Sequence, residues 1–146
     1  MMEGRPEPVH IRKEVAAQLQ AARVAERDQS LFYRTLAGEA ERRGDRELSE
    51  RLNGLHADEQ HHVSRLSARL LELGEPLEEL PPPSLPEVAL DEWEPLARER
   101  EQIESERYEA LLAHRGLDEH TRRMLEEFLG AERHHGDALG GKWMGA

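Results

Sequence analysis

The sequence contains no cysteine, few aromatic residues and no long apolar run. Among its 146 residues there is no cysteine, and only 4% are aromatic. The missing cysteines exclude disulfides, cysteine-bound zinc and iron–sulfur clusters. No segment approaches the ~18 apolar residues of a membrane-spanning helix, and the N-terminal residues lack the apolar stretch of a signal peptide. We therefore expect a cytoplasmic protein with no membrane partner.

Excess positive charge is also missing. Charged residues make up 35% of the chain, and the formal net charge is −11. Surfaces that bind nucleic acid need clustered Lys and Arg, so we expect no nucleic-acid partner. An acidic protein instead attracts divalent cations over a range set by the ionic strength. The length suits one domain with one core, and we expect residues 1–146 to form it.

Glycine and proline are confined to a few places, and the segments between them predict four helices. Asp45, Asp91 and Asp118 stand where the last three helices begin and are candidate N-caps. Residues 74–90 include five prolines and predict a crossover without helix. The predicted helices cover approximately residues 8–43, 45–73, 91–115 and 118–139.

The lengths of the connections predict how the helices are joined. The turns near Gly44 and Gly116 are short, which favours two antiparallel helical hairpins. A crossover of about 17 residues spans roughly 55 Å when extended. A helix of about 28 residues is roughly 42 Å long. Because the crossover is long enough to return along the helices, the sequence predicts an all-α four-helix bundle of two antiparallel hairpins joined by a long crossover.

The two halves of the chain resemble each other. Residues 26–33 (ERDQSLFY) match residues 101–108 (EQIESERY) in their Glu, Ser and Tyr. Residues 45–62 match residues 118–135 in an Asp, a Glu and two adjacent histidines. Two charged helices that were similar by chance would not keep both registers. We interpret the pattern as a duplicated helical hairpin.

Polar residues interrupt the apolar stripe of each predicted helix. Steps of three and four residues place Glu59 and His62 on the inward face of the second helix, and Glu132 and His135 on that of the fourth. His61 and His134 fall beside these stripes. The first and third helices show the same interruption. Their inward faces carry Glu26, Tyr33, Glu101, Glu104 and Tyr108.

These inward carboxylates predict a metal centre. Burying four or five carboxylates without cations would cost many kcal/mol, since even one buried charge costs several. Two histidines cannot balance them, whereas two metal ions can. In Glu-x-x-His both side chains lie on one helix face and can reach the same metal. We expect metal ligation by Glu26, Glu59, His62, Glu101, Glu104, Glu132 and His135.

The donor types favour particular metals. An oxygen-rich site with one imidazole per metal suits iron or manganese better than a closed zinc site. Tyr33 and Tyr108 lie two turns after Glu26 and Glu101 on the same stripes. We expect their hydroxyls to hydrogen-bond the ligand carboxylates. The alternative for both tyrosines is a plain packing role.

Together these residues resemble the ligand set of the ferritin-like di-iron carboxylate superfamily. In that bundle two helices give one Glu each, and the other two give Glu-x-x-His. Within the superfamily, Glu104 and the tyrosine pair are most similar to rubrerythrin-type proteins. The resemblance implies two iron ions, reaction with hydrogen peroxide or dioxygen, and an external electron donor. The chain departs from rubrerythrins because, without cysteine, it has no rubredoxin-like domain.

Several functions stay open at this point. The first is a di-iron oxidoreductase, a peroxidase or ferroxidase. The second is iron binding or sequestration without multiple turnover. A di-metal hydroxylase and a manganese catalase-like enzyme are further alternatives. A homodimer is a further expectation, because the helices expose leucine-rich flanks.

Overall fold

A computed structural model describes residues 9–139 and contains four α-helices and no strand within that range. The four helices are α1 (Val9–Arg42), α2 (Arg46–Glu72), α3 (Trp93–Leu112) and α4 (Glu119–Asp137), with a short 3₁₀ helix η1 (Leu90–Glu92) before α3. The all-α prediction is confirmed. The predicted start at residue 8 lies outside the described residues, and α3 ends earlier than expected, at Leu112.

Glycines end the two long helices. Gly44 follows α1 with φ 77°, and Gly74 follows α2 with φ 81°. After each helix, three backbone N–H groups bond to carbonyls of its last turn, such as Asp45 N to Ala40 O at 2.9 Å. This Schellman arrangement needs a left-handed residue, which glycine adopts without strain.

Aspartates cap two helices as predicted, but the third predicted cap is wrong. The Asp45 carboxylate accepts from Leu48 N at 3.1 Å, and that of Asp118 accepts from Thr121 N at 3.0 Å. Asp91 lies inside η1, and Glu92 at the start of α3 makes no capping bond through its side chain. Pro95 stands at the third position of α3, so a cap at Glu92 has no N–H to bond there.

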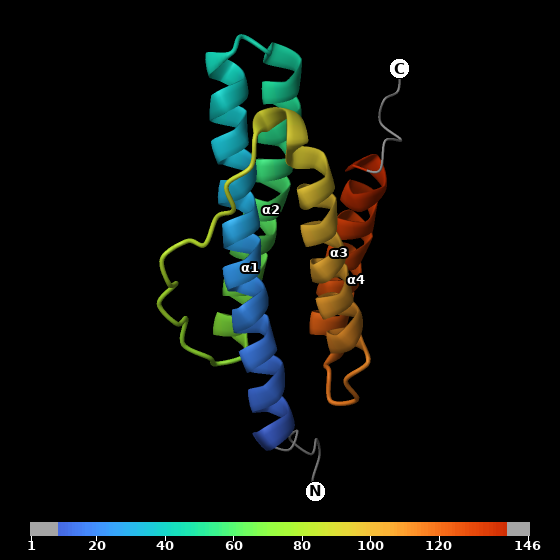
Figure 1. The fold of residues 1–146 in the computed structure, drawn as a ribbon. Coiled ribbons are helices and arrows are strands. Elements are labelled where there is room, and N and C mark those ends of the chain that lie inside the picture. The colour runs from blue at the N-terminus through green and yellow to red at the C-terminus, as the bar shows by residue number, and fades with distance from the viewer. Residues whose placement is uncertain (1–8, 140–146) are drawn as a thin grey trace, which may run out of the picture.

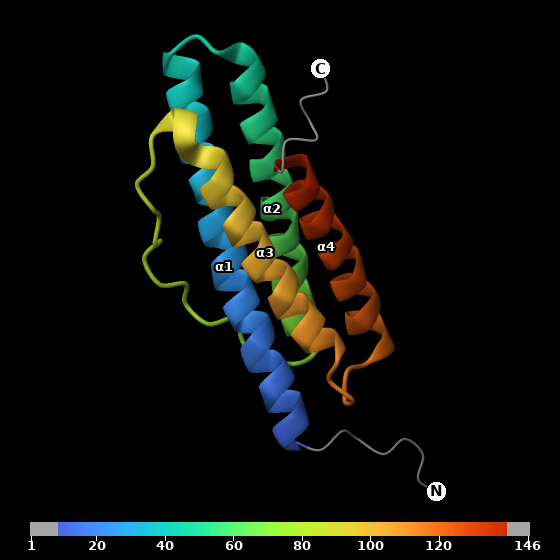
Figure 2. The ribbon, with the colours of Figure 1, turned by 45° about the vertical axis from the view of Figure 1, so that its right-hand side comes forward.

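The helices pack mainly in two pairs. α1 packs along α2 and α3 along α4, with weaker contacts of α1 with α3 and of α2 with α4. Figure 1 shows α1 and α2 side by side, joined at one end by the turn at Gly44. Figure 2, a view turned by 45°, shows the same pairs adjacent. It also shows residues 75–89 running outside α1 to the start of α3.

The crossover is fastened to α1 by side chains of that helix. Gln20 Nε2 donates to Pro76 O at 2.9 Å, and Arg23 donates to Glu78 O at 2.9 Å. Arg27 donates to Pro81 O. These bonds go to backbone carbonyls, so a segment without regular structure still has polar partners.

Two apolar clusters fill the interior at different heights. One includes Leu19, Leu66 and Phe128, and the other includes Phe32, Leu52 and Trp93. Along α1 and α2 the first cluster gives way to the second across Glu26 and Glu59, which are fully buried. A layer of polar side chains therefore separates the two apolar clusters. None of the helices in the described part of the chain is long and apolar enough to cross a membrane.

Candidate metal centre

The polar layer brings together carboxylates and histidines from all four α-helices. Glu26, Glu59, Glu101 and Glu132 are each 0% exposed, and one comes from each helix. His62 and His135 are 5% and 4% exposed. By contrast, His61 and His134, which the sequence placed beside the stripes, are exposed.

The donor atoms form two overlapping groups. One group contains Glu26, Glu59, His62 and Glu132, and the other contains Glu59, Glu101, Glu132 and His135. Within each group, one ligand atom per residue lies within 4.8 Å of the others. Glu59 and Glu132 belong to both groups, so their carboxylates are placed to span two positions. Six of the seven predicted ligands thus lie together.

Each histidine directs Nδ1 at the carboxylates. His62 Nδ1 is 3.2 Å from Glu26 Oε2 and 3.4 Å from Glu132 Oε1. His135 Nδ1 is 3.2 Å from Glu59 Oε1 and 3.7 Å from Glu101 Oε1. Each Glu-x-x-His pair therefore meets carboxylates of other helices as well as its own.

Glu104 is buried but belongs to neither group of donors. It is 6% exposed, and its Oε1 lies 3.4 Å from Arg107 Nε. Burial, and after it repulsion from Glu26, raises the pKa of Glu104 to about 8. Its role as a ligand stays a prediction.

The two tyrosines hold carboxylates of the cluster. Tyr33 donates to Glu101 Oε2, and Tyr108 donates to Glu26 Oε2, each at 2.5 Å. Both residues are 0% exposed. Burial and the neighbouring carboxylate charge raise the pKa of each phenol well above its ordinary value, so both remain donors. Both tyrosines bond a carboxylate as expected, and they also pack in the core.

Two partners of the cluster were not found from the sequence. Asp58 Oδ2 lies 3.0 Å from His135 Nε2, the nitrogen on the far side of the ring from the carboxylates. Gln29 Nε2 donates to the Tyr33 hydroxyl at 2.9 Å. Asp58 directly precedes Glu59 in the sequence, but its contact crosses from α2 to α4. Periodicity along one helix does not reveal such a contact.

The electrostatics of the cluster oppose full ionisation. Burial, followed by repulsion from Glu26, raises the pKa of Glu59 and that of Glu132 well above the ordinary value. Burial also acts against ionised Glu26, but its close contacts with Glu59, His62 and Tyr108 lower its pKa overall. Within the described part of the chain, no Lys or Arg lies within 4.0 Å of the Glu26, Glu59, Glu101 or Glu132 carboxylates.

Orphaned acceptors provide a test of whether the residues fit a metal. Both oxygens of Glu59 and of Glu132, and one each of Glu26, Glu101 and Glu104, are buried without a hydrogen-bond partner. His135 Nδ1 is also buried without a hydrogen-bond partner. Buried polar atoms nearly always have partners, and carboxylate oxygens with imidazole nitrogens are iron and manganese ligands. The residues present could therefore hold metal.

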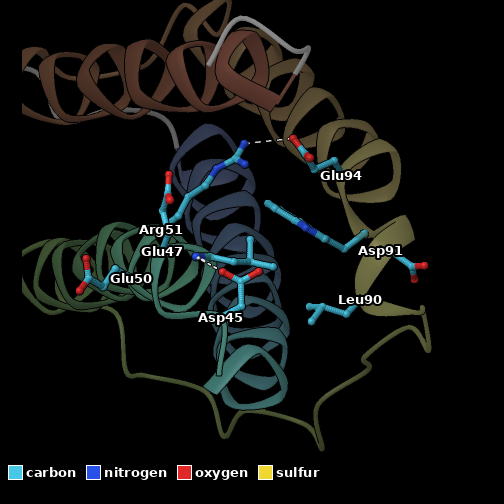
Figure 3. Close-up of a pocket in the computed structure, with 9 residues that line it drawn as sticks. Asp45, Glu47, Glu50, Arg51, Leu90, Asp91 and Glu94 are labelled. Carbon is cyan, nitrogen blue, oxygen red and sulfur yellow. Dashed lines mark hydrogen bonds and ion pairs between the residues drawn. The ribbon is translucent and has the colours of Figure 1, made fainter. Parts of the chain in front are cut away.

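A separate pocket lies away from the polar layer. It has a volume of about 740 Å³ and lies between the start of α2 and the start of α3 (Figure 3). Asp45, Glu47, Glu50, Asp91 and Glu94 give it an acidic rim, with Arg51 paired to Glu94 at 3.0 Å. None of the candidate ligands lines it.

Comparisons with known proteins add no assignment. No model of a known protein family matches the chain, and a search of curated proteins finds no match.

Proposed function

We propose that the polar layer is a dinuclear metal centre and that the chain is a di-iron oxidoreductase of the rubrerythrin or ferritin-like type. Its reactants are hydrogen peroxide or dioxygen and an external electron donor. The observation that carries this proposal is the set of buried carboxylate oxygens without partners, which converge from four helices. The proposal includes the finer fold, two antiparallel hairpins joined by a long crossover.

The residues divide into roles by their position. Glu26 with His62 would hold one ion, and Glu101 with His135 the other. Glu59 and Glu132, which belong to both donor groups, would span the two positions. Two iron ions, when bound, would supply the one-electron redox steps that carboxylate, hydroxyl and imidazole groups cannot perform.

The surrounding residues orient the ligands and hold protons. The Tyr33 and Tyr108 hydroxyls fix one oxygen of Glu101 and of Glu26, which leaves the other oxygen of each for a metal. Asp58 fixes the His135 ring through Nε2, so Nδ1 faces the cluster. Phe128 stacks on His62 at a ring distance of 4.1 Å and shields it from water.

Metal analysis tests the proposal directly. Protein made without a histidine tag and loaded anaerobically with Fe(II) should retain two irons per chain. The double variant Glu59→Ala with Glu132→Ala should retain none, because both donor groups lose two members. The matched control is Glu47→Ala with Glu50→Ala. It removes two carboxylates of α2 that line the pocket of Figure 3, and it should retain two irons per chain. If the control and the double variant retain the same amount, the proposed site is wrong.

Reaction stoichiometry separates the alternatives. A peroxidase or ferroxidase should consume many equivalents of peroxide or Fe(II) per chain when electron donor or metal is resupplied. A sequestration protein should stop consuming peroxide or Fe(II) once its metal site has been filled and has reacted once. Many irons retained per chain would indicate storage. Manganese instead of iron in protein isolated from cells grown with both metals would favour the catalase-like alternative.

A further inference from the structure

A small cleft between α3 and α4 lies against the carboxylate cluster. It has a volume of about 190 Å³, and Glu132 is among the residues that line it. Glu132 is 0% exposed and carries two oxygens without partners. The walls nearest to it include Ser105 on α3 and Gly136 on α4. Both are small, and they leave space where larger side chains would close the seam.

The other half of the chain shows the same seam filled. In the matching registers of the two halves, Ser30 and Val63 stand where Ser105 and Gly136 stand. Val63 is 9% exposed and Ser30 is 0% exposed. Ser30 Oγ lies 2.8 Å from His56 Nδ1 and donates to Gln60 Oε1 at 3.1 Å. Side chains therefore occupy the space between α1 and α2.

Two arginines at matching positions of the two halves also have different surroundings. Arg98 lines the α3–α4 cleft, and Arg23 is its counterpart on α1. Arg23 donates to Ser67 Oγ at 3.0 Å and to the crossover carbonyl of Glu78 at 2.9 Å. The crossover thus lies against the first hairpin, while Arg98 is exposed at the rim.

The open space in the cleft depends on Gly136. A Cβ added to Gly136 would meet no atom within 4 Å. Glycine is therefore not required there by a close approach, and a helix would be more stable with alanine. Its effect is to leave the cleft unfilled beside His135.

The size of the cleft limits what can enter. A volume of about 190 Å³ holds several molecules of water size, each of which takes roughly 30 Å³ in the liquid. Arg98 and Arg133 at the rim are offset by Asp137 in the same lining and by the ion pair of Arg133 with Glu109, so the cleft selects by size rather than by charge. We propose that this cleft admits small uncharged reactants, of the size of hydrogen peroxide or dioxygen, to the cluster, and that Gly136 keeps it open. This inference rests on the proposed function.

Nitric oxide binding to the Fe(II)-loaded protein tests the route without relying on turnover. Nitric oxide is uncharged and has the size of dioxygen, and its binding to iron is followed by stopped-flow absorbance. Gly136→Leu should lower the second-order rate at least tenfold, because leucine fills the cleft. Gly130→Leu is the matched control, since Gly130 is on the same helix, is exposed and also has no atom near its Cβ. Its rate should equal that of the unmodified protein.

The outcomes distinguish the two proposals. If the unmodified protein holds no iron, the proposed function is wrong and the route is wrong with it. If Gly136→Leu holds two irons and binds nitric oxide as fast as Gly130→Leu, only the route is wrong. Should Gly136→Leu fail to fold by circular dichroism, Gln102→Trp decides, because exposed Gln102 lines the same cleft from α3. An unchanged rate in that variant would equally overturn the route.

Discussion

Replacing Glu104 by glutamine should stabilise the metal-free protein, and the gain should grow with pH. The carboxyl has an ordinary pKa of 4.5, which the fold raises to about 8. Its folded state therefore holds a proton that the unfolded chain releases. The associated stability is fully present below pH 4.5 and is lost as the pH rises through about 8. Glutamine keeps the shape of the side chain and never ionises.

The magnitude follows from the shift. Each pKa unit corresponds to about 1.4 kcal/mol, so the penalty on Glu104 is about 3 kcal/mol at pH 7 and about 5 kcal/mol above pH 8. The pKa of about 8 already includes the attraction between Glu104 and Arg107, so that contact needs no separate correction. The expected gain is therefore about 5 kcal/mol at pH 9 and almost none at pH 4.5. Gln29, which stands at the matching position of α1, shows that an amide fits such a site.

Urea unfolding in the presence of a chelator measures this effect. The free energy of unfolding of both proteins should be determined at pH 5, 7 and 9, with equal m-values as the sign that only stability changed. Glu99→Gln, an exposed position on the same helix, is the control and should change stability by less than about 0.5 kcal/mol. A gain that is the same at pH 5 and pH 9, or a loss at pH 9, would refute the electrostatic reasoning.

Two further substitutions probe the surroundings of the cluster. Asp58→Asn should weaken metal binding about 10- to 100-fold in a competition titration, because the His135 ring loses its carboxylate partner; equal affinity would show that the contact does not orient the ring. Phe128→Ala should lower the free energy of unfolding by about 3 to 5 kcal/mol in chemical denaturation, because the ring is 1% exposed and packs on His62 and Tyr108; a loss below about 1 kcal/mol would mean that the core closes over the gap.

The helices themselves were predictable from local chemistry. Helix ends are set by residues within one turn of them, here by Gly44, Gly74, Asp45 and Asp118. Such local effects can be predicted from the neighbouring sequence. The predicted cap Asp91 was wrong because this residue lies inside the 3₁₀ helix η1 and α3 begins only at Trp93. The inward faces could be predicted because side chains three and four residues apart lie on the same face of a helix.

The partners across helices could be inferred only in part. Glu59 and His62 were recognised as inward, but the sequence does not specify that His62 Nδ1 lies beside Glu26 and Glu132. The roles of Asp58 and Gln29 depend on the rotation of one helix against another. That rotation is set by the packing of many side chains at once, and no single periodic pattern encodes it.

The sequence by itself therefore determined four helices, their inward residues and the gathering of carboxylates and histidines into one layer. Hydrophobic periodicity is sufficient for this, since a polar residue on an apolar stripe must be buried with the stripe. Only the tertiary structure decided that the donors form two groups sharing Glu59 and Glu132, that Glu104 lies outside them, and that the α3–α4 seam is open at Gly136. These features depend on distances of a few ångströms between helices, which packing fixes and sequence spacing does not.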